Sequence, residues 1–431
     1  MKRMNIGLLG IGTVGGGVFE LLKLNTQEIQ RKTSTDIKII VVADKNISRA
    51  KEIAGTSIEI TDDAFKLVED KKIDVIIELI GGTGIAKDLV VKAIENKKHV
   101  VTANKALIAN FGNELFELAK KNNVTLAFEA SVAGGIPILK SIREGLAGNK
   151  IEWVAGIING TTNFILTEMR ERGISFVKAL SEAQSLGYAE ADPTFDIEGI
   201  DAAHKLTILA SLSFGIPMSF KDVYVEGIKT LEQKDIQYAE ELGYRIKLLG
   251  IAKKRDKGIE LRVHPTLIPE KRLIANVNGA MNAVVVKGNM VGPTLYYGSG
   301  AGAFPTASAV VADLIDISRS SKVPSYGFEN SKINVIPIYK IEDVICGYYL
   351  RFRVTDKPGV LAEITKLFGD KKISIDAMLQ KEPQEQESEA DIIMLSHLAV
   401  EKEINSVIHA IEALAATVGK VIKIRLEDLS K

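Results

Sequence analysis

The stretch from Met4 to Leu24, "MNIGLLGIGTVGGGVFELLKL", contains the pattern that decides the fold of the first part of the chain. Its apolar start is typical of a strand, its glycines of a tight turn, and its continuation of a helix. Within it, Gly10, Gly12 and Gly15 fit G-x-G-x-x-G, a spacing that lets the backbone approach a pyrophosphate at the positive end of the helix. The spacing predicts a dinucleotide-binding turn. The alternative is that the glycines serve only helix–sheet packing.

Further apolar segments repeat this alternation of strand and helix. Strands are expected within residues 36–46, 73–84, 98–109 and 124–139, and helices within 85–97 and 302–320. Strands that are apolar on both faces and alternate with helices indicate a parallel sheet covered by helices. We therefore predict an α/β fold with a Rossmann-type domain over residues 1–135, completed by a helix from about 303–325.

Two groups of residues follow the strands of this domain, where an open parallel sheet binds ligands. Asp44 ends the second strand and is the candidate acid for a ribose hydroxyl, with surface solvation as the alternative. Lys45 and Arg49 could instead meet a 2′-phosphate, so the choice between NAD and NADP stays open.

Gly81, Gly82 and Thr83 end the next strand. Glycines at this position would let the nicotinamide half of a cofactor come close. A plain turn is the alternative.

The remaining chain divides into a second domain and a tail. Residues 136–302 read as mixed α+β, residues 326–346 as a linker, and residues 347–431 as a βαββαβ unit.

Composition excludes several classes of protein. The chain has 55 basic and 55 acidic residues, which gives no basic field for nucleic acid or a membrane surface. It has a single cysteine, which excludes an intrachain disulfide framework and fits a reducing cytoplasm. The apolar run at the amino terminus is too short for a secretory signal. The sequence also has no run of about eighteen consecutive apolar residues, the length expected of a membrane-spanning helix. We therefore expect a soluble cytoplasmic enzyme with neither a nucleic-acid nor a membrane partner.

Lys105 is the only charged residue between Val100 and Asn113. It lies at the expected start of a helix, where the helix dipole disfavours a cation. At the rim of the cofactor crevice it could bind a substrate carboxylate or the cofactor, or transfer a proton. An exposed lysine is the alternative.

The segment Gly199–Pro217, "GIDAAHKLTILASLSFGIP", reads as a nearly all-apolar helix that carries Asp201 and Lys205 four residues apart. This spacing places both on one helix face. An exposed pair of this kind contributes only about 0.3–0.5 kcal/mol, which is a weak reason for its presence. A half-buried ammonium held by an aspartate is a candidate general acid. A structural ion pair is the alternative.

A loop rich in carboxylates precedes this helix. It begins at Gly187 and carries Tyr188, Glu190, Asp192, Asp196 and Glu198. Carboxylates that face a lysine suit a substrate with an ammonium group, while a solvated acidic loop is the alternative.

The motifs "GLLGIGTVGGGV", "VTANKALIA", "FEASVAGGIPIL", "GIINGTTNFIL", "EAQSLGYAEADPTFDIEGIDAAHKLTILA" and "AFPTASAVVADL" occur in this order over about residues 1–330. In this region the chain resembles homoserine dehydrogenase. The tail, with "VTDKPGVLAEI", resembles an ACT domain. The resemblance implies interconversion of L-aspartate 4-semialdehyde and L-homoserine with NAD or NADP, and makes the second domain a substrate-binding and dimerisation domain.

The resemblance also assigns roles to single residues. It implies that Lys205 transfers the proton, with Lys105 as a second active-site lysine and Asp201 and Glu190 as substrate ligands. Together with the residues singled out above from their positions, the predicted substrate set is Lys105, Gly187, Tyr188, Glu190, Asp196 and Asp201. The predicted cofactor set is Gly10, Gly12, Thr13, Val14, Gly15, Asp44, Gly81, Gly82, Thr83, Lys105 and Gly302.

Three further expectations follow from the resemblance. A structural sodium ion would be held by the Glu129 carboxylate and the carbonyls of Val132, Gly134 and Ile136. Threonine would bind the ACT domain near Asp356 and Gly359, unless the tail serves only oligomerisation. The enzyme would be a homodimer or homotetramer. The alternatives are another ACT-bearing dehydrogenase of an amino-acid pathway and a non-catalytic nucleotide-sensing regulator.

Overall fold

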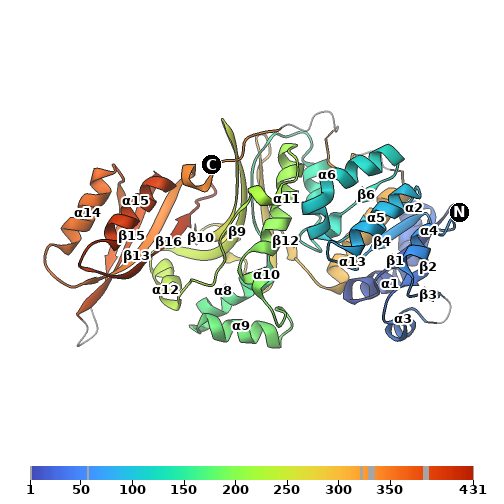
Figure 1. The fold of residues 1–431 in the computed structure, drawn as a ribbon, viewed down its shortest axis with the longest axis horizontal. Coiled ribbons are helices and arrows are strands. Elements are labelled where there is room, and N and C mark those ends of the chain that lie inside the picture. Colours follow the sequence, from blue (N-terminus) through green and yellow to red (C-terminus); the bar gives the residue numbers. More distant parts are fainter. Residues whose placement is uncertain (1, 56–57, 321–323, 329–334, 382–387, 431) are drawn as a thin grey trace.

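Figure 1 shows the computed structural model of the chain, which describes residues 2–55, 58–320, 324–328, 335–381 and 388–430. The first domain, a central mixed sheet and the C-terminal unit lie in a row along the longest axis, with the amino terminus at one end (Figure 1). Among the described helices, none combines the length and hydropathy needed to cross a membrane.

Six parallel strands form the sheet of the first domain, in the order β3-β2-β1-β4-β5-β6. Helices α1, α3 and α13 pack on one face, and α4, α5 and α6 on the other. The strands are β1 (Lys2–Leu9), β2 (Thr35–Ala43), β3 (Glu59–Thr61), β4 (Val75–Glu78), β5 (His99–Thr102) and β6 (Leu126–Ala127). The helices are α1 (Thr13–Leu24), α2 (Thr26–Thr33), α3 (Ile47–Ala54), α4 (Ala64–Glu69), α5 (Ile85–Glu95), α6 (Lys105–Asn122) and α13 (Ala303–Ser318).

Helix α13, which follows β12 in the chain, packs against α1 of the first domain. It lies so close to α1 that a Cβ at Gly17 would be 2.7 Å from the Ala303 carbonyl oxygen. The absence of a side chain at Gly17 therefore permits the contact that completes this domain.

The expected strand within residues 124–139 is wrong over most of its length. Only β6 is extended, and a 3-10 turn at Glu129–Ser131 follows it. The cause is the buried Glu129 carboxylate, which accepts hydrogen bonds from the backbone N–H groups of Leu139 and Lys140 and folds the segment back on itself.

A ten-stranded mixed sheet occupies the rest of the chain. Its order is β12-β11-β7-β9-β10-β16-β13-β15-β14, and β8 pairs with β10. The strands are β7 (Ile151–Ile157), β8 (Tyr224–Val225), β9 (Tyr244–Arg255), β10 (Gly258–Pro269), β11 (Met281–Gly288), β12 (Gly292–Ser299), β13 (Ile345–Thr355), β14 (Ile375–Gln380), β15 (Glu389–Val400) and β16 (Thr417–Leu426). The helices are α7 (Ile138–Lys140), α8 (Gly160–Arg172), α9 (Phe176–Ser185), α10 (Thr194–Ile197), α11 (Ile200–Phe214), α12 (Gln233–Glu241), α14 (Val360–Asp370) and α15 (Glu401–Glu412).

The C-terminal unit has the predicted βαββαβ order and is joined edge to edge with the central sheet. Thr266 and Leu267 of β10 pair in parallel with Arg425 and Leu426 of β16. Helices α14 and α15 cover one face of this unit, while α12 from the central region packs on the other. Residues 329–334 of the expected linker lie outside the described part of the chain.

Helix α11 lies between α6 of the first domain and strands β9 and β10 of the large sheet (Figure 1). Every residue from Asp201 to Phe214 is buried. This position explains the apolar sequence of the helix and brings its two charged residues to the boundary between the domains.

Candidate active site

The glycine turn between β1 and α1 has two kinds of glycine. A Cβ at Gly10 would lie 2.9 Å from the Leu79 carbonyl oxygen, and one at Gly15 would lie 2.2 Å from the Gly10 carbonyl oxygen, so both serve packing. Gly12 has no atom within 4 Å of such a Cβ and is exposed together with Thr13. The open side of the turn is therefore at the N-terminus of α1, where a pyrophosphate fits. Val14, one residue further into α1, is only partly buried.

Asp44 lies beside this turn at the end of β2. One oxygen of its carboxylate accepts a hydrogen bond from Ile11 N at 2.8 Å, and the other accepts one from Asn46 N at 2.8 Å. The carboxylate therefore orders the glycine turn and is placed at the sheet edge where the ribose was predicted. Lys45 and Arg49 are exposed next to it.

The second predicted cofactor turn is also an open edge. Gly81 and Gly82 adopt φ of +81° and +72°, a Cβ at either position would have no atom within 4 Å, and Thr83 is exposed. The buried Glu78 shapes this turn, because its Oε1 accepts hydrogen bonds from Ile80 N and Gly81 N at 2.9 and 3.0 Å. Sequence reasoning did not single out Glu78, which ends a strand of otherwise apolar residues.

Hydrogen bonds connect this turn to Lys105. The side chain of Asn104 donates to the Gly82 carbonyl at 2.7 Å and caps α6 by accepting from Leu107 N. Lys105 is the next residue, and its Nζ lies 2.8 Å from Asp201 Oδ1. This ion pair joins the two domains and compensates for the lysine at a helix N-terminus.

Asp201 is shared between two ammonium groups. Its Oδ2 accepts a hydrogen bond from Lys205 Nζ at 2.7 Å, while its Oδ1 faces Lys105. The side chain of Asp201 is 4% exposed, that of Lys205 is 11% exposed and that of Lys105 is 34% exposed. Lys205 therefore lies at the bottom of the cluster and Lys105 at its rim.

The two lysines differ in the direction of their pKa shifts. Burial lowers the pKa of Lys205, and the opposing effect of Asp201 is too small to reverse this shift. Burial also acts on Lys105, but the nearby Asp201 carboxylate outweighs it, with help from Asp196 and Glu190, and raises its pKa. Burial would raise the pKa of Asp201, yet the charges of the two lysines hold it well below the ordinary value. The charged form is therefore disfavoured at Lys205 and favoured at Lys105.

Asn159 and the backbone next to it complete this cluster, and sequence reasoning missed both. Lys205 Nζ donates to the Ile158 carbonyl at 2.7 Å. The Asn159 amide nitrogen donates to Asp201 Oδ2 at 2.8 Å and to Asp196 Oδ1 at 2.6 Å. The only available signal was an asparagine directly before a helix in "GIINGTTNFIL", which predicts a cap rather than a site residue.

The loop before α11 supplies the outer side of the site. Gly187 has φ of +76°, Tyr188 and Glu190 are exposed, and Glu190 contributes to the raised pKa of Lys105. Burial raises the pKa of Asp196, and the Asp201 charge adds to this effect. Asp196 and Glu190 of this loop therefore lie within electrostatic reach of Lys105, whereas Glu198 pairs with Lys229 and Asp192 accepts a hydrogen bond from Thr194 N.

Gly302 begins α13 with φ of +114° and is exposed. The contact between Gly17 and Ala303 places this helix start against α1, on the same domain as the glycine turn. The location is compatible with the predicted cofactor contact.

The predicted sodium ligands lie on one loop. Glu129 is 2% exposed, and burial raises its pKa to about 8, with Asp313 adding to the shift. Ala133 and Gly134 adopt positive φ of 56° and 49°, which turns the loop whose carbonyls were predicted to bind the ion. A buried carboxylate with carbonyl oxygens is a donor set of the kind a hard cation takes, and each carboxylate oxygen keeps a second acceptor site beside its amide hydrogen bond.

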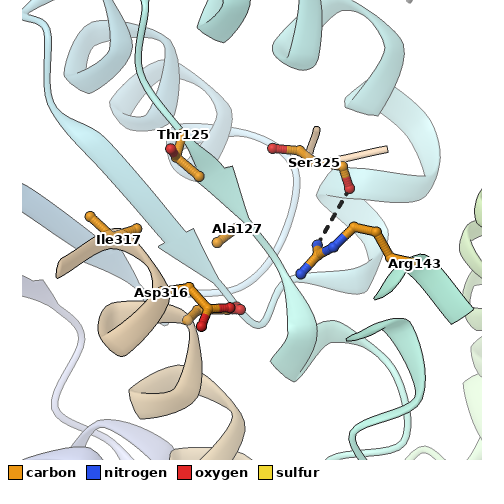
Figure 2. Close-up of a pocket in the computed structure, with 7 residues that line it drawn as sticks. Thr125, Ala127, Arg143, Asp316, Ile317 and Ser325 are labelled. Atoms are coloured by element: carbon orange, nitrogen blue, oxygen red, sulfur yellow. Dashed lines mark hydrogen bonds between the residues drawn. The ribbon is translucent and has the colours of Figure 1, made fainter. Parts of the chain in front are cut away.

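A small cavity lies beside Asp313. Figure 2 shows its lining, with Arg143 donating to the Ser325 carbonyl at 3.5 Å. Its volume of about 30 Å³ suits a water molecule and not a substrate or nucleotide. Within the described residues, no group of three or more His, Cys, Asp or Glu side chains could hold a metal ion.

The predicted effector residues lie at the start of α14 in the C-terminal unit. Asp356 N donates to the Ser388 carbonyl at 2.9 Å, and Gly359 caps the helix with φ of +96°. Both lie in the turn that follows β13, as expected.

The glycine turn follows β1 and Lys105 follows β5 at the carboxyl edge of one parallel sheet, and Asp201 on α11 pairs with Lys105. This arrangement is typical of an oxidoreductase with a dinucleotide cofactor. Family models agree with this class: "Homoserine dehydrogenase, NAD binding domain" matches residues 10–129, "Homoserine dehydrogenase" matches residues 137–315, and "ACT domain" matches residues 348–416. A homoserine dehydrogenase of Neisseria gonorrhoeae is 55% identical over the full length of both chains.

Solved structures show the same relationship. The crystal structure of a homoserine dehydrogenase from Thiobacillus denitrificans matches with 57% identity and a TM-score of 0.95, over 100% of this chain and 99% of that one. A hyperthermophilic archaeal homoserine dehydrogenase mutant in complex with NADPH matches with 28% identity and a TM-score of 0.63, over 74% of this chain and 99% of that one. The chain belongs to the homoserine dehydrogenase family and carries a C-terminal ACT domain.

Proposed function

We propose that the chain interconverts L-aspartate 4-semialdehyde and L-homoserine with NAD or NADP in the cytoplasm. The observation that carries the proposal is the buried Lys205 ammonium, held by Asp201 at the boundary between the nucleotide domain and α11. Family membership and the NADPH complex of an archaeal relative support the same reaction.

The nicotinamide supplies or accepts the hydride when bound. Lys205 protonates the oxygen of the aldehyde as it becomes an alkoxide, and in the reverse direction it takes the proton of the hydroxyl. Its lowered pKa suits the reverse step, because a deprotonated amine is then available closer to neutral pH. Lys105 remains charged and stabilises negative charge at the substrate.

The acidic loop binds the amino group of the substrate. Glu190 is exposed at the rim, within electrostatic reach of Lys105, and Asp196 lies deeper beside Asn159. A substrate with one ammonium and one carboxylate can therefore pair with the loop at one end and with a lysine at the other.

We infer that the ACT domain regulates this site, with threonine as the effector. The connection from ACT domain to active site is short: Arg425 in β16 donates to Glu226 Oε2 at 2.8 Å, and two residues later Ile228 N donates to the Ile197 carbonyl at 2.9 Å. Ile197 is the residue after Asp196. A change in the ACT domain can thus be transmitted to the acidic loop through a few covalent and hydrogen bonds.

We also propose that the loop from Glu129 to Ile136 holds a structural sodium ion, and that the enzyme is a homodimer or homotetramer. The donor chemistry described above supports the ion. The family relationship supports an oligomer.

A spectrophotometric assay tests the proposed reaction and its regulation by threonine. The purified chain is mixed with L-homoserine and either NAD⁺ or NADP⁺, with and without threonine, and absorbance of the reduced cofactor is followed. We expect turnover with at least one cofactor and inhibition by threonine. Turnover of 3-phosphoglycerate and not of homoserine would instead indicate another ACT-bearing dehydrogenase, and turnover that does not respond to threonine would contradict the regulatory role.

A further inference from the structure

Asn159 connects the end of β7 to the start of α8 and uses both atoms of its carboxamide. Its Oδ1 accepts from Thr162 N and from the Thr162 hydroxyl, both at 2.8 Å, and so caps α8. Its Nδ2 donates in the opposite direction, to Asp201 and Asp196. The residue is 4% exposed, so the amide is committed to these partners and not to solvent.

The placement of this amide addresses an electrostatic difficulty of the site. Asp196 and Asp201 both accept from one nitrogen, which brings two carboxylates close together. Two negative charges so close together repel each other, which raises the free energy of the state in which both carboxylates are ionised. A neutral donor between them lowers that free energy without adding a charge.

The amide also fixes which oxygen of Asp201 faces each lysine. Oδ2 receives both Asn159 and Lys205, which leaves Oδ1 for Lys105. The neighbouring Ile158 carbonyl accepts from Lys205 Nζ, so consecutive residues hold the lysine and its counter-ion. Both residues directly follow β7, which pairs with β9 and β11.

From this geometry we propose that Asn159 is a positioning residue for proton transfer by Lys205. It fixes the positions of the Asp201 and Asp196 carboxylates relative to the two lysines, in addition to capping α8. The inference rests on the proposed homoserine dehydrogenase reaction and adds to it a residue that touches the Lys205–Asp201 pair without contacting the reacting atoms.

Several charged groups face this pair and contribute to its titration. They are Lys105 from α6, Asp196 from α10, His204 on α11 and, at longer range, Glu190 from the loop. These groups are the same in the unmodified enzyme and in a variant at Asn159, so a difference between their pH profiles reports the change at Asn159.

The substitution Asn159→Asp separates the two roles of the side chain. An aspartate caps a helix as well as asparagine, so the bond to Thr162 N is retained. The donor to Asp196 and Asp201 is lost, and an acidic group enters between them. We expect kcat for homoserine oxidation to fall about 10- to 100-fold, with little change in the KM for the cofactor.

The pH dependence is the readout that a merely structural role would not move. Homoserine oxidation requires a deprotonated Lys205, and an added negative charge nearby favours its protonated form. The acid limb of the pH–kcat profile of Asn159→Asp should therefore move to higher pH. A profile and a kcat equal to those of the unmodified enzyme would overturn the proposal.

Two further variants keep the test decisive. Ser175→Asp introduces the same acidic cap at the exposed start of the neighbouring α9 and should leave kcat and the pH profile unchanged. If Asn159→Asp does not fold, Asn159→Ser retains a capping oxygen without a charge, and its kcat should fall about tenfold. Full activity of folded Asn159→Ser would also overturn the proposal, whereas absence of homoserine turnover by the unmodified chain would refute the proposed function itself.

Discussion

Two clusters of buried and partly buried charged residues differ in the way they are built. The cluster of the proposed active site, here called the active-site cluster, consists of Lys105, Lys205, Asp196 and Asp201. The cluster at the joint between the central sheet and the ACT domain, here called the seam, consists of Glu226, Glu260, Arg262, Glu401, Arg425 and Glu427. In the seam, Arg425 donates to Glu401 and Glu226, and Arg262 donates to Glu260 and Glu427. Both arginine side chains are 1% exposed.

The direction of the pKa shifts separates the two clusters. Burial opposes the charge of Arg425 and of Arg262, but their carboxylate partners outweigh it and raise the pKa of each further above its ordinary value. For Lys205 the effect of burial is larger than the opposing effect of Asp201, so the pKa is lowered. A guanidinium that makes paired hydrogen bonds is permanently charged, whereas an ammonium with one shared carboxylate can lose its proton. Burial of a charge therefore does not distinguish structure from catalysis. What distinguishes the two roles is the type of the basic residue, the number of carboxylates paired with it and the exposed fraction of its side chain.

Exchange of the active-site lysine for arginine tests this distinction most directly. Lys205→Arg retains the charge and a partner for Asp201, but it cannot release a proton near neutral pH. We expect kcat to fall by about 10²- to 10⁴-fold, the range of general acid–base catalysis, with the cofactor still bound. Steady-state kinetics together with a fluorescence titration of the reduced cofactor measure both quantities.

The comparison fails if Lys205→Arg turns over homoserine at near-normal rates. In that case the buried ammonium has the same structural role as the arginines of the seam. Lys205→Met, which removes the charge altogether, should be at least as slow and serves as the reference for complete loss of the proton donor.

Removal of an arginine in the seam should affect stability and not chemistry. Arg425→Met removes the arginine that pairs with Glu401 and Glu226 and leaves Lys423 as the remaining basic partner of Glu401. Breaking a buried pair costs up to about 3–5 kcal/mol. We expect the urea midpoint of unfolding to fall while the kcat of the folded enzyme stays within a few-fold of normal.

The pH dependence of the free energy of unfolding at acid pH tests Arg425→Met independently. Burial would raise the pKa of Glu401, but Arg425, with a smaller contribution from Lys423, holds it below its ordinary value of 4.5. Its contribution to stability is therefore present above pH 4.5 and lost as the pH falls below that value. Arg425→Met should flatten this acid-induced loss. An unchanged profile would show that the seam does not stabilise the protein through this pair.

The extent to which each cluster was predictable from sequence follows from the separation of its partners along the chain. Asp201 and Lys205 were recognised because a spacing of four on an apolar helix is a local signal. The seam was not predicted, because Arg262 and Glu427 are 165 positions apart and Arg425 and Glu226 are 199 apart. No local pattern reports such contacts.

The same reasoning applies inside the active site and in the fold. Asn159 lies 42 positions from Asp201, and its sequence context signals only a helix cap. Strands β1, β2, β4 and β5 carry continuous apolar runs and were predicted, whereas the three-residue β3 was missed. Strand β6 was overestimated because the folding back at Glu129 depends on a buried carboxylate. Elements set by local periodicity were predictable, and those set by a single buried polar contact were not.

The smallest expected effect concerns the open side of the active-site cluster, where Glu190 is exposed and faces Lys105. In Glu190→Gln a neutral amide of the same size replaces the carboxylate proposed to bind the substrate ammonium. We expect the KM for homoserine to rise about tenfold, which corresponds to about 1.4 kcal/mol, with little change in kcat. Glu198→Gln is the matched control, because Glu198 is on the same loop but its carboxylate lies 4.0 Å from Lys229 instead. Equal KM values for the two variants would show that neither exposed carboxylate binds the substrate ammonium specifically and that both contribute only to the negative charge of the loop. The buried groups of the active-site cluster would then select the substrate alone.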